Sequence, residues 1–283
     1  MSQIPPYASI SERVWYVIYR LICLSIYLFL MAPILVIIPL SFNTQPYFTF
    51  TTEMLTLDPD GYSIRWYQSI LENPQWINAI KNSFIIGIAS TILATTLGTV
   101  AALGLSRSSM PFKGAVMAIL ISPMIVPVII TAAGMYFFFS SIGLAQTYLG
   151  LILAHTVLGT PFVVITVTAT MSGFDLSLIR ASASMGATPI RTFFSIIAPL
   201  IAPGVFSGGL FAFITSFDEV VVVLFLSGAE QRTVPRQMWA GIREQISPTI
   251  LAVATLLIMV SVMLLLTLEY LRRRNEKLRG VQA

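Results

Sequence analysis

Residues 180–199 read RASASMGATPIRTFFSIIAP, a polar to amphipathic stretch inside a chain that is otherwise almost continuously apolar. Gly186 and Pro189 predict a break between two short helices, at residues 178–185 and 189–197, because glycine tolerates a turn and proline suits the first position of a helix. We interpret the stretch as an elbow outside the bilayer that another component grips. The second helix has one apolar face at helical spacing, made of Ile190, Phe193, Phe194 and Ile197.

The chain as a whole has the composition of a membrane protein. Of its 283 residues, 56% are hydrophobic and 10% are charged, against roughly 25% charged residues in a soluble domain. A membrane-spanning helix needs about 20 apolar residues. Five runs lack any Asp, Glu, Lys or Arg, at residues 21–52, 82–106, 114–174, 192–217 and 245–268.

We therefore predict an all-α membrane protein with six transmembrane helices. The run 114–174 is long enough for two of them, with a turn at residues 140–147. A transmembrane barrel is excluded, because the segments do not alternate polar and apolar residues. The expected helices lie near residues 14–40, 77–105, 115–139, 148–171, 202–226 and 249–271.

The basic residues predict the orientation of the chain. Of the 16 Lys and Arg residues, all but five fall at the termini or in the even-numbered loops. Because cytoplasmic loops are rich in Lys and Arg, we expect both termini and the elbow in the cytoplasm. The basic tail RRRNEKLRG is interpreted as an anchor signal, so no nucleic-acid partner is expected. The five residues in odd-numbered loops are Arg65, Lys81, Arg232, Arg236 and Arg243.

Two features within the apolar segments are candidates for a solute path. Asp218 and Glu219 follow Phe217 and form an acid pair, which is costly in a membrane helix. The pair is either an anionic stop for a cationic solute or a salt-bridge or helix-capping contact. Pro123 and Pro127 lie four residues apart and predict a kink, which either lines a water-filled path or serves packing.

The sequence offers few residues that could carry out catalysis or bind a metal ion. His155 is the single histidine, and it is interpreted either as a hydrogen-bonded core residue or as a proton relay. Cys23 is the single cysteine, so no disulfide forms within the chain. No phosphate-binding loop, GxSxG elbow or HExxH helix occurs. We expect no catalytic residue, metal or cofactor here. If the protein moves a solute uphill, the energy must therefore come from another chain.

The fifth loop holds a second amphipathic stretch, PRQMWAGIREQI at residues 235–246. Met238, Ile242 and Ile246 recur every four residues, which predicts a surface helix. Such a helix either lies on the membrane or docks a soluble partner.

The elbow has the pattern RAS-x-x-x-GA at residues 180–187, followed by an apolar face and Pro199. This pattern resembles the EAA loop of type I ABC importer permeases, with residues 77–268 as the shared core of a MetI-like fold. The segments SIRWYQSILENPQWINAIKNSF, SFDEVVVVLFLSG and VPRQMWAGIREQ resemble the spermidine/putrescine class of these permeases. Arg180 departs from the family pattern, which has a glutamate at this position.

The resemblance implies one permease subunit of an importer in the bacterial inner membrane. Its implied partners are a second homologous permease subunit, two ATP-binding subunits, a soluble periplasmic or extracellular solute-binding protein and membrane lipid. ATP and magnesium would belong to the ATPase subunits. The residues implied to couple this chain to the ATPase are Arg180, Ala181, Ser182, Met185, Gly186, Ala187 and Ile190.

The expected function is translocation of a small organic solute, with a polyamine as the first candidate. One alternative is an ABC permease for an opine or an amino-acid derivative. Another is an ion-coupled secondary transporter or channel that uses Asp218, Glu219 and His155, although no inverted repeat is apparent. The expected organisation is an arm, first helix and external loop at 1–76, the core at 77–268 with a coupling loop at 172–199, and a basic tail at 269–283. The expected path residues are Pro123, Pro127, Phe217, Asp218 and Glu219.

Overall fold

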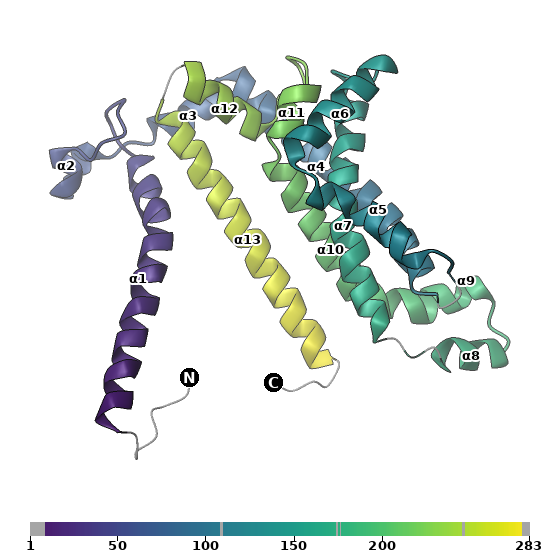
Figure 1. The fold of residues 1–283 in the computed structure, drawn as a ribbon. Helices are drawn as coiled ribbons and strands as arrows, with labels where there is room; N and C mark the ends of the chain where they lie inside the picture. Colours follow the sequence, from purple (N-terminus) through teal and green to yellow (C-terminus); the bar gives the residue numbers. More distant parts are fainter. Residues whose placement is uncertain (1–8, 108–109, 174, 176, 245–246, 279–283) are drawn as a thin grey trace. The chain divides into compact units, whose positions relative to one another are not determined.

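The computed structural model describes residues 9–107, 110–173, 175, 177–244 and 247–278, and these are mainly helical (Figure 1). The elements in chain order are α1 (Ile10–Leu40), α2 (Thr52–Leu55), the 3-10 helix η1 (Pro59–Gly61), α3 (Arg65–Glu72), α4 (Pro74–Leu105), α5 (Lys113–Ile125), α6 (Val128–Ser141), α7 (Tyr148–Ser172), α8 (Ser177–Ser184), α9 (Pro189–Thr192), the π-helix η2 (Phe193–Ile197), α10 (Ala198–Asp218), α11 (Val221–Leu226), α12 (Val234–Glu244) and α13 (Thr249–Leu278).

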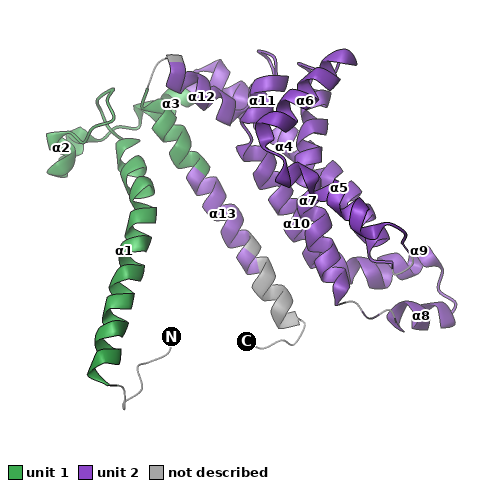
Figure 2. Cartoon of the chain, in the orientation of Figure 1, with its two compact units in different colours: residues 1–70, 246–257 green, residues 71–245, 258–283 purple. Residues whose placement is uncertain are grey.

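Length and composition make this a multi-pass membrane protein. Within the described residues, five helices are long and apolar enough to cross a membrane, or six if the bent pair α5 and α6 counts as one span. This result confirms the all-α fold with six apolar segments. The chain divides into two compact units (Figure 2), residues 1–70 with 246–257 and residues 71–245 with 258–283.

In the first unit, the loop after α1 is held together by buried and half-buried polar contacts. The indole Nε1 of Trp66 donates a hydrogen bond to the Asn43 carbonyl at 2.7 Å. The hydroxyl groups of Tyr67 and Ser41 lie 2.7 Å apart. Since the backbone groups of an irregular loop need partners, these contacts let a long connection keep a defined shape next to a membrane helix.

In the second unit, α4, α7 and α10 form the tightly packed centre. A methyl group added at Gly98 of α4 would lie 2.7 Å from Cβ of Val163 in α7. One added at Gly208 of α10 would lie 2.7 Å from Cα of the same Val163. Glycines at these positions allow the helix backbones to approach closely. The second apolar segment of the sequence, α4, therefore lies at the centre of its bundle.

The segment predicted as one kinked helix over residues 115–139 is broken into two helices at its second proline. α5 ends at Ile125 and α6 begins at Val128, and the two are bent by 103°. Pro127 causes the break, because it lacks an amide hydrogen and forces the residue before it out of the helical region. Val126 accordingly has an extended backbone with ψ of 134°.

The prediction of one helix over residues 202–226 also fails. α10 ends at Asp218, Glu219 is extended, and the short helix α11 starts at Val221. The acid pair therefore marks a helix end rather than the middle of a span. An acid here costs less to bury than one in the middle of a membrane helix. The first amides of a helix have no partner within the helix, so a carboxylate can accept hydrogen bonds from them at the start of α11.

The second half of the elbow is not a separate short helix at residues 189–197. Pro189–Asp218 is a single 30-residue apolar helix, in which the π-helix η2 joins α9 to α10. A proline ring clashes with the carbonyl four residues earlier, and for Pro199 that residue is Ser195, inside η2. The wider π turn accommodates the clash, so the helix continues through Pro199.

Candidate functional site

The elbow folds as a helical hairpin of α8 and α9, at one end of α7 and α10 (Figure 1). Ser182 of α8 and Thr192 of α9 are both buried, and their hydroxyl oxygens lie 2.8 Å apart. This hydrogen bond joins the two halves of the elbow. A buried hydroxyl that loses its partner is costly, so the bond holds the hairpin angle.

Asp175 caps the start of α8. Its carboxylate accepts hydrogen bonds from the Ser177 hydroxyl at 2.6 Å and the Ser177 amide at 2.8 Å. These bonds stabilise the charged form and lower the pKa of Asp175, and the positive charge of Arg180 lowers it further. The first turn of α8 is thus stabilised by an ionised acid at its amino end.

Gly186 ends α8 in a Schellman motif. Its φ is +79°, and its amide donates to the Ala183 carbonyl at 3.0 Å. The Ala187 amide donates to the Ser182 carbonyl at 3.1 Å. These two bonds define the motif, whose positive-φ position favours glycine. The sequence-based expectation of a glycine turn between two helical pieces is confirmed.

The elbow exposes three large apolar side chains. Met185 is 80% exposed, Ile190 72% and Phe194 68%. Arg180 and Ala181 are exposed as well, whereas Ser182 is buried and Ala187 is half-buried. Ile197, expected on the same apolar face, instead packs against the buried core of the second unit. The structure therefore brings the expected coupling residues onto one hairpin, with an apolar surface open to a partner.

The acid pair separates into two different environments. Glu219 is half-buried, and its carboxylate accepts a hydrogen bond from the Val222 amide at 2.9 Å. This is the helix-capping contact that the sequence left open as one interpretation. Asp218 is exposed at the end of α10.

Aromatic rings lie next to the end of α10. Phe217 stacks on Phe213 with ring centroids 5.4 Å apart, and Phe84 of α4 meets Phe217 edge-on at 5.3 Å. Pro123 and Pro127 lie elsewhere, in α5 and at the amino end of α6, so the structure places the expected path residues in two groups.

His155 joins a buried polar cluster between helices. Its Nδ1 lies 2.7 Å from the Ser216 hydroxyl, which also accepts from the Ser90 hydroxyl at 3.1 Å. These contacts tie α7, α10 and α4 together, as the core interpretation expects. Among the described residues, no group of His, Cys, Asp and Glu side chains is arranged to hold a metal ion.

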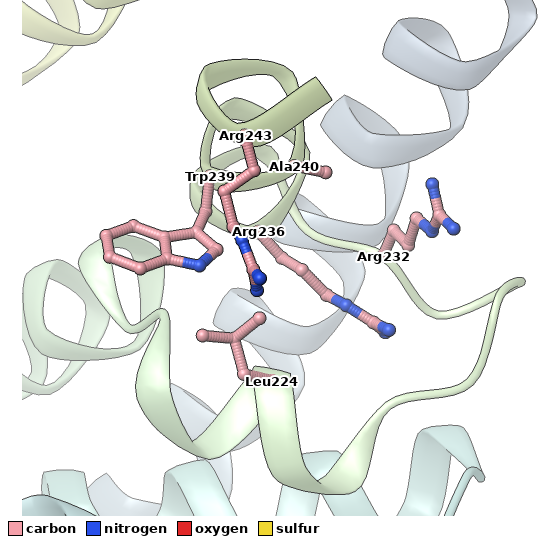
Figure 3. A pocket seen from close by; sticks show the side chains of 6 residues that line it. All are labelled: Leu224, Arg232, Arg236, Trp239, Ala240 and Arg243. Atoms are coloured by element: carbon pink, nitrogen blue, oxygen red, sulfur yellow. The ribbon is translucent and has the colours of Figure 1, made fainter.

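A cavity of about 370 Å³ next to α12 had no counterpart among the sequence-based site predictions (Figure 3). The spacing of seven residues between Arg236 and Arg243 is the sequence signal for it, because it places both on one face of the expected surface helix. The cavity is lined by Leu224, Arg232, Arg236, Trp239, Ala240 and Arg243.

Comparison with known proteins places the chain in a family. Residues 94–277 match the profile described as binding-protein-dependent transport system inner membrane component. The chain is 30% identical over 250 residues to the spermidine/putrescine transport system permease protein PotC of Haemophilus influenzae, covering 88% of this chain and 94% of that protein. It is 30% identical over 259 residues to the putrescine transport system permease protein PotI of Escherichia coli, covering 89% of each.

Solved structures show the same fold at lower identity. A bacterial ABC transporter involved in import of the acidic polysaccharide alginate matches with a TM-score of 0.72 at 14% identity, over 94% of this chain and 99% of that one. An amino acid ABC transporter matches with a TM-score of 0.57 at 15% identity, over 74% of this chain and 98% of that one. With a profile that covers most of its length, the chain belongs to the family of binding-protein-dependent inner-membrane transport components, the non-catalytic permease subunits of ABC transporters.

Proposed function

We propose that this chain is a permease subunit of an ATP-driven importer for a small organic cation of the polyamine class. The observation that carries the proposal is the exposed apolar hairpin of α8 and α9, in a chain whose relatives are named as spermidine and putrescine permeases. The proposed partners are a second homologous permease subunit, two ATP-binding subunits that hold ATP and magnesium, and a solute-binding protein outside the membrane. Both termini and the hairpin face the cytoplasm.

The hairpin is proposed to seat in the ATPase subunit. Met185, Ile190 and Phe194 supply apolar area, and burying each would contribute about 1.5–3 kcal/mol. The Ser182 to Thr192 hydrogen bond and the Schellman motif make the hairpin stiff. A stiff, gripped element can pass a rigid-body movement to the helices above it.

Arg180 gives this hairpin a charge opposite to that of the family glutamate. It is exposed on α8, next to the apolar residues of the hairpin. We expect the ATPase partner to present a carboxylate or a backbone carbonyl to Arg180, because both accept hydrogen bonds from a guanidinium group.

The end of α10 is proposed to form part of the solute path. Asp218 supplies an exposed carboxylate directly after Phe217, and the ring of Phe217 contacts those of Phe84 and Phe213. A carboxylate and aromatic faces together suit an organic ammonium group, because ring faces attract cations. Glu219 has a capping role, so Asp218 is the acid available to solute.

Reconstitution tests the proposed function directly. The chain is assembled in proteoliposomes with its ATPase subunits, its second permease and its solute-binding protein, and uptake of labelled spermidine and putrescine is measured. We expect uptake that requires ATP and the binding protein. Uptake driven by an ion gradient without the ATPase would instead support the secondary-transporter hypothesis. ATP-dependent uptake of an amino-acid derivative but not of polyamines would keep the importer and change its solute.

A further inference from the structure

The cavity at α12 is positively charged and partly apolar. Three of its six lining residues are arginines, and none is acidic. Leu224 of α11 and Trp239 of α12 supply apolar surface and are 38% and 47% exposed. Figure 3 shows the arginine side chains of α12 extending from the helix toward Leu224, with Arg232 on the loop that precedes the helix.

Arg236 is fixed in place by the structure. Its Nη1 donates hydrogen bonds to the Gly228 carbonyl at 2.7 Å, to the Ser227 carbonyl at 2.9 Å and to the Ser227 hydroxyl. Within the described part of the chain these hydrogen bonds all use Nη1, so Nε and Nη2 remain as donors. Arg236 therefore presents a preorganised donor surface to the cavity.

The three positive charges of the arginines that line the cavity repel one another unless a negative charge lies close by. Burial lowers the pKa of Arg236, and the neighbouring charge of Arg232 lowers it further. Both effects disfavour the guanidinium ion, which nevertheless stays charged in proteins. A bound anion would offset the repulsion and the loss of hydration together.

We infer that this cavity binds a phosphate-bearing anion with an apolar neighbour, as a phospholipid headgroup has. The phosphodiester of such a lipid carries its negative charge on two unesterified oxygens, and each of them can accept hydrogen bonds from guanidinium groups. The volume of about 370 Å³ lies at the lower end for small-ligand pockets. Tryptophan and an amphipathic helix are both typical of the membrane–water interface.

This site is separate from the proposed cation path. Three arginines repel a polyamine, so the cavity does not serve the solute of the proposed function. A free phosphate compound and an anionic lipid would both satisfy its chemistry. A site for lipid would hold α12 at the membrane surface, next to the apolar helix α11.

The test measures quenching of Trp239 fluorescence by brominated phosphatidylglycerol or brominated phosphatidylcholine. It uses the full-length chain in neutral detergent, and Trp239→Phe supplies the baseline from the other three tryptophans. Both lipids carry an anionic phosphodiester, but phosphatidylcholine adds a choline ammonium that the arginines repel. We therefore expect phosphatidylglycerol to bind on the order of 10-fold more tightly. The double variant Arg232→Gln/Arg243→Gln should lose that preference. Arg236 is left intact because it also holds the loop at Ser227 and Gly228.

The control variant is Arg65→Gln, which removes one arginine from α3, outside the cavity, and should keep the preference. If the glutamine double variant fails to fold, Arg232→Lys/Arg243→Lys keeps the charge and should bind with weaker selectivity. Displacement of the lipid by glycerol 3-phosphate would support the site with a soluble phosphate as its source, and failure to displace would support lipid. Equal binding of both lipids, or an equal loss in Arg65→Gln, would overturn the inference. So would a double variant that binds lipid normally and loses only the solute-binding protein.

Discussion

Gly186 offers the sharpest test of the elbow, because its φ of +79° is unfavourable for any residue with a Cβ atom. An added methyl group would meet no atom within 4 Å, so the effect of Gly186→Ala is one of backbone strain and not of crowding. The strain is about 1–2 kcal/mol, which shifts the population of the hairpin geometry by a factor of about 5–30. We expect ATP-driven uptake to fall by a similar factor while ATP hydrolysis continues.

The assay compares solute imported with ATP hydrolysed in proteoliposomes that hold the assembled transporter. Gly186→Asn should lose less than Gly186→Ala, because asparagine tolerates the left-handed region better than other residues. Gly173→Ala is the matched control, since Gly173 has a φ of −94° and also has open space around it. Unchanged coupling in Gly186→Ala, or an equal loss in Gly173→Ala, would refute the role of this turn.

Three further predictions concern single side chains. Asp218→Asn should lower cation uptake by up to about 5-fold, which corresponds to the free energy of an exposed charge pair. Glu219→Gln keeps an acceptor for the Val222 amide and should transport normally. Equal effects of the two substitutions would contradict the assignment of Asp218 to the path. Ser182→Ala leaves the buried hydroxyl of Thr192 without its partner, which costs about 1–3 kcal/mol. Hydrogen exchange of the backbone amides in α8 should therefore speed up by about 5- to 150-fold. The control Ser184→Ala should change little, because Ser184 is exposed. The pKa of Asp175 in the folded protein is below its unfolded value of about 4. Its stabilisation of α8 is therefore present above that pH and is lost as pH falls through the folded pKa. Amide exchange measured against pH should show this loss, and Asp175→Asn should remove the pH dependence.

Much of the fold follows from the apolar runs, because bilayer thickness fixes the length that each span must have. The turn at Gly186 was also predictable, since glycine followed by proline three residues later separates two helical patterns. The prolines at 123 and 127 predicted a kink but not a break with a bend of 103°, and the break after Asp218 was not predicted. A charge-free run satisfies the length criterion whether it forms one straight helix or two bent ones, so composition cannot place the break.

The candidate sites, like the fold, were predictable only in part. The exposed face of the hairpin depends on which apolar residues pack inward, and Ile197 does so while Ile190 and Phe194 do not. Helical spacing alone gave them one face, because spacing carries no information on which neighbouring helix lies alongside. The arginine cavity at α12 depends on the loop at Ser227 and Gly228 folding back onto Arg236. Such a contact between separate elements leaves no local pattern in the sequence.

The continuity of Pro189–Asp218 connects the two proposed sites of the transport cycle. At a rise of 1.5 Å per residue, this 30-residue helix is about 45 Å long, with the elbow at one end and Asp218 at the other. A displacement imposed on Ile190 by an ATPase subunit therefore reaches the end of α10 without crossing a flexible loop. The π-helix η2 is one place along this path where the regular hydrogen-bond ladder changes, and π turns in helices are frequent at functional positions. We expect η2, together with the proline at position 203 inside α10, to set how much of the elbow's movement is passed on, because α10 is otherwise packed against α4 and α7.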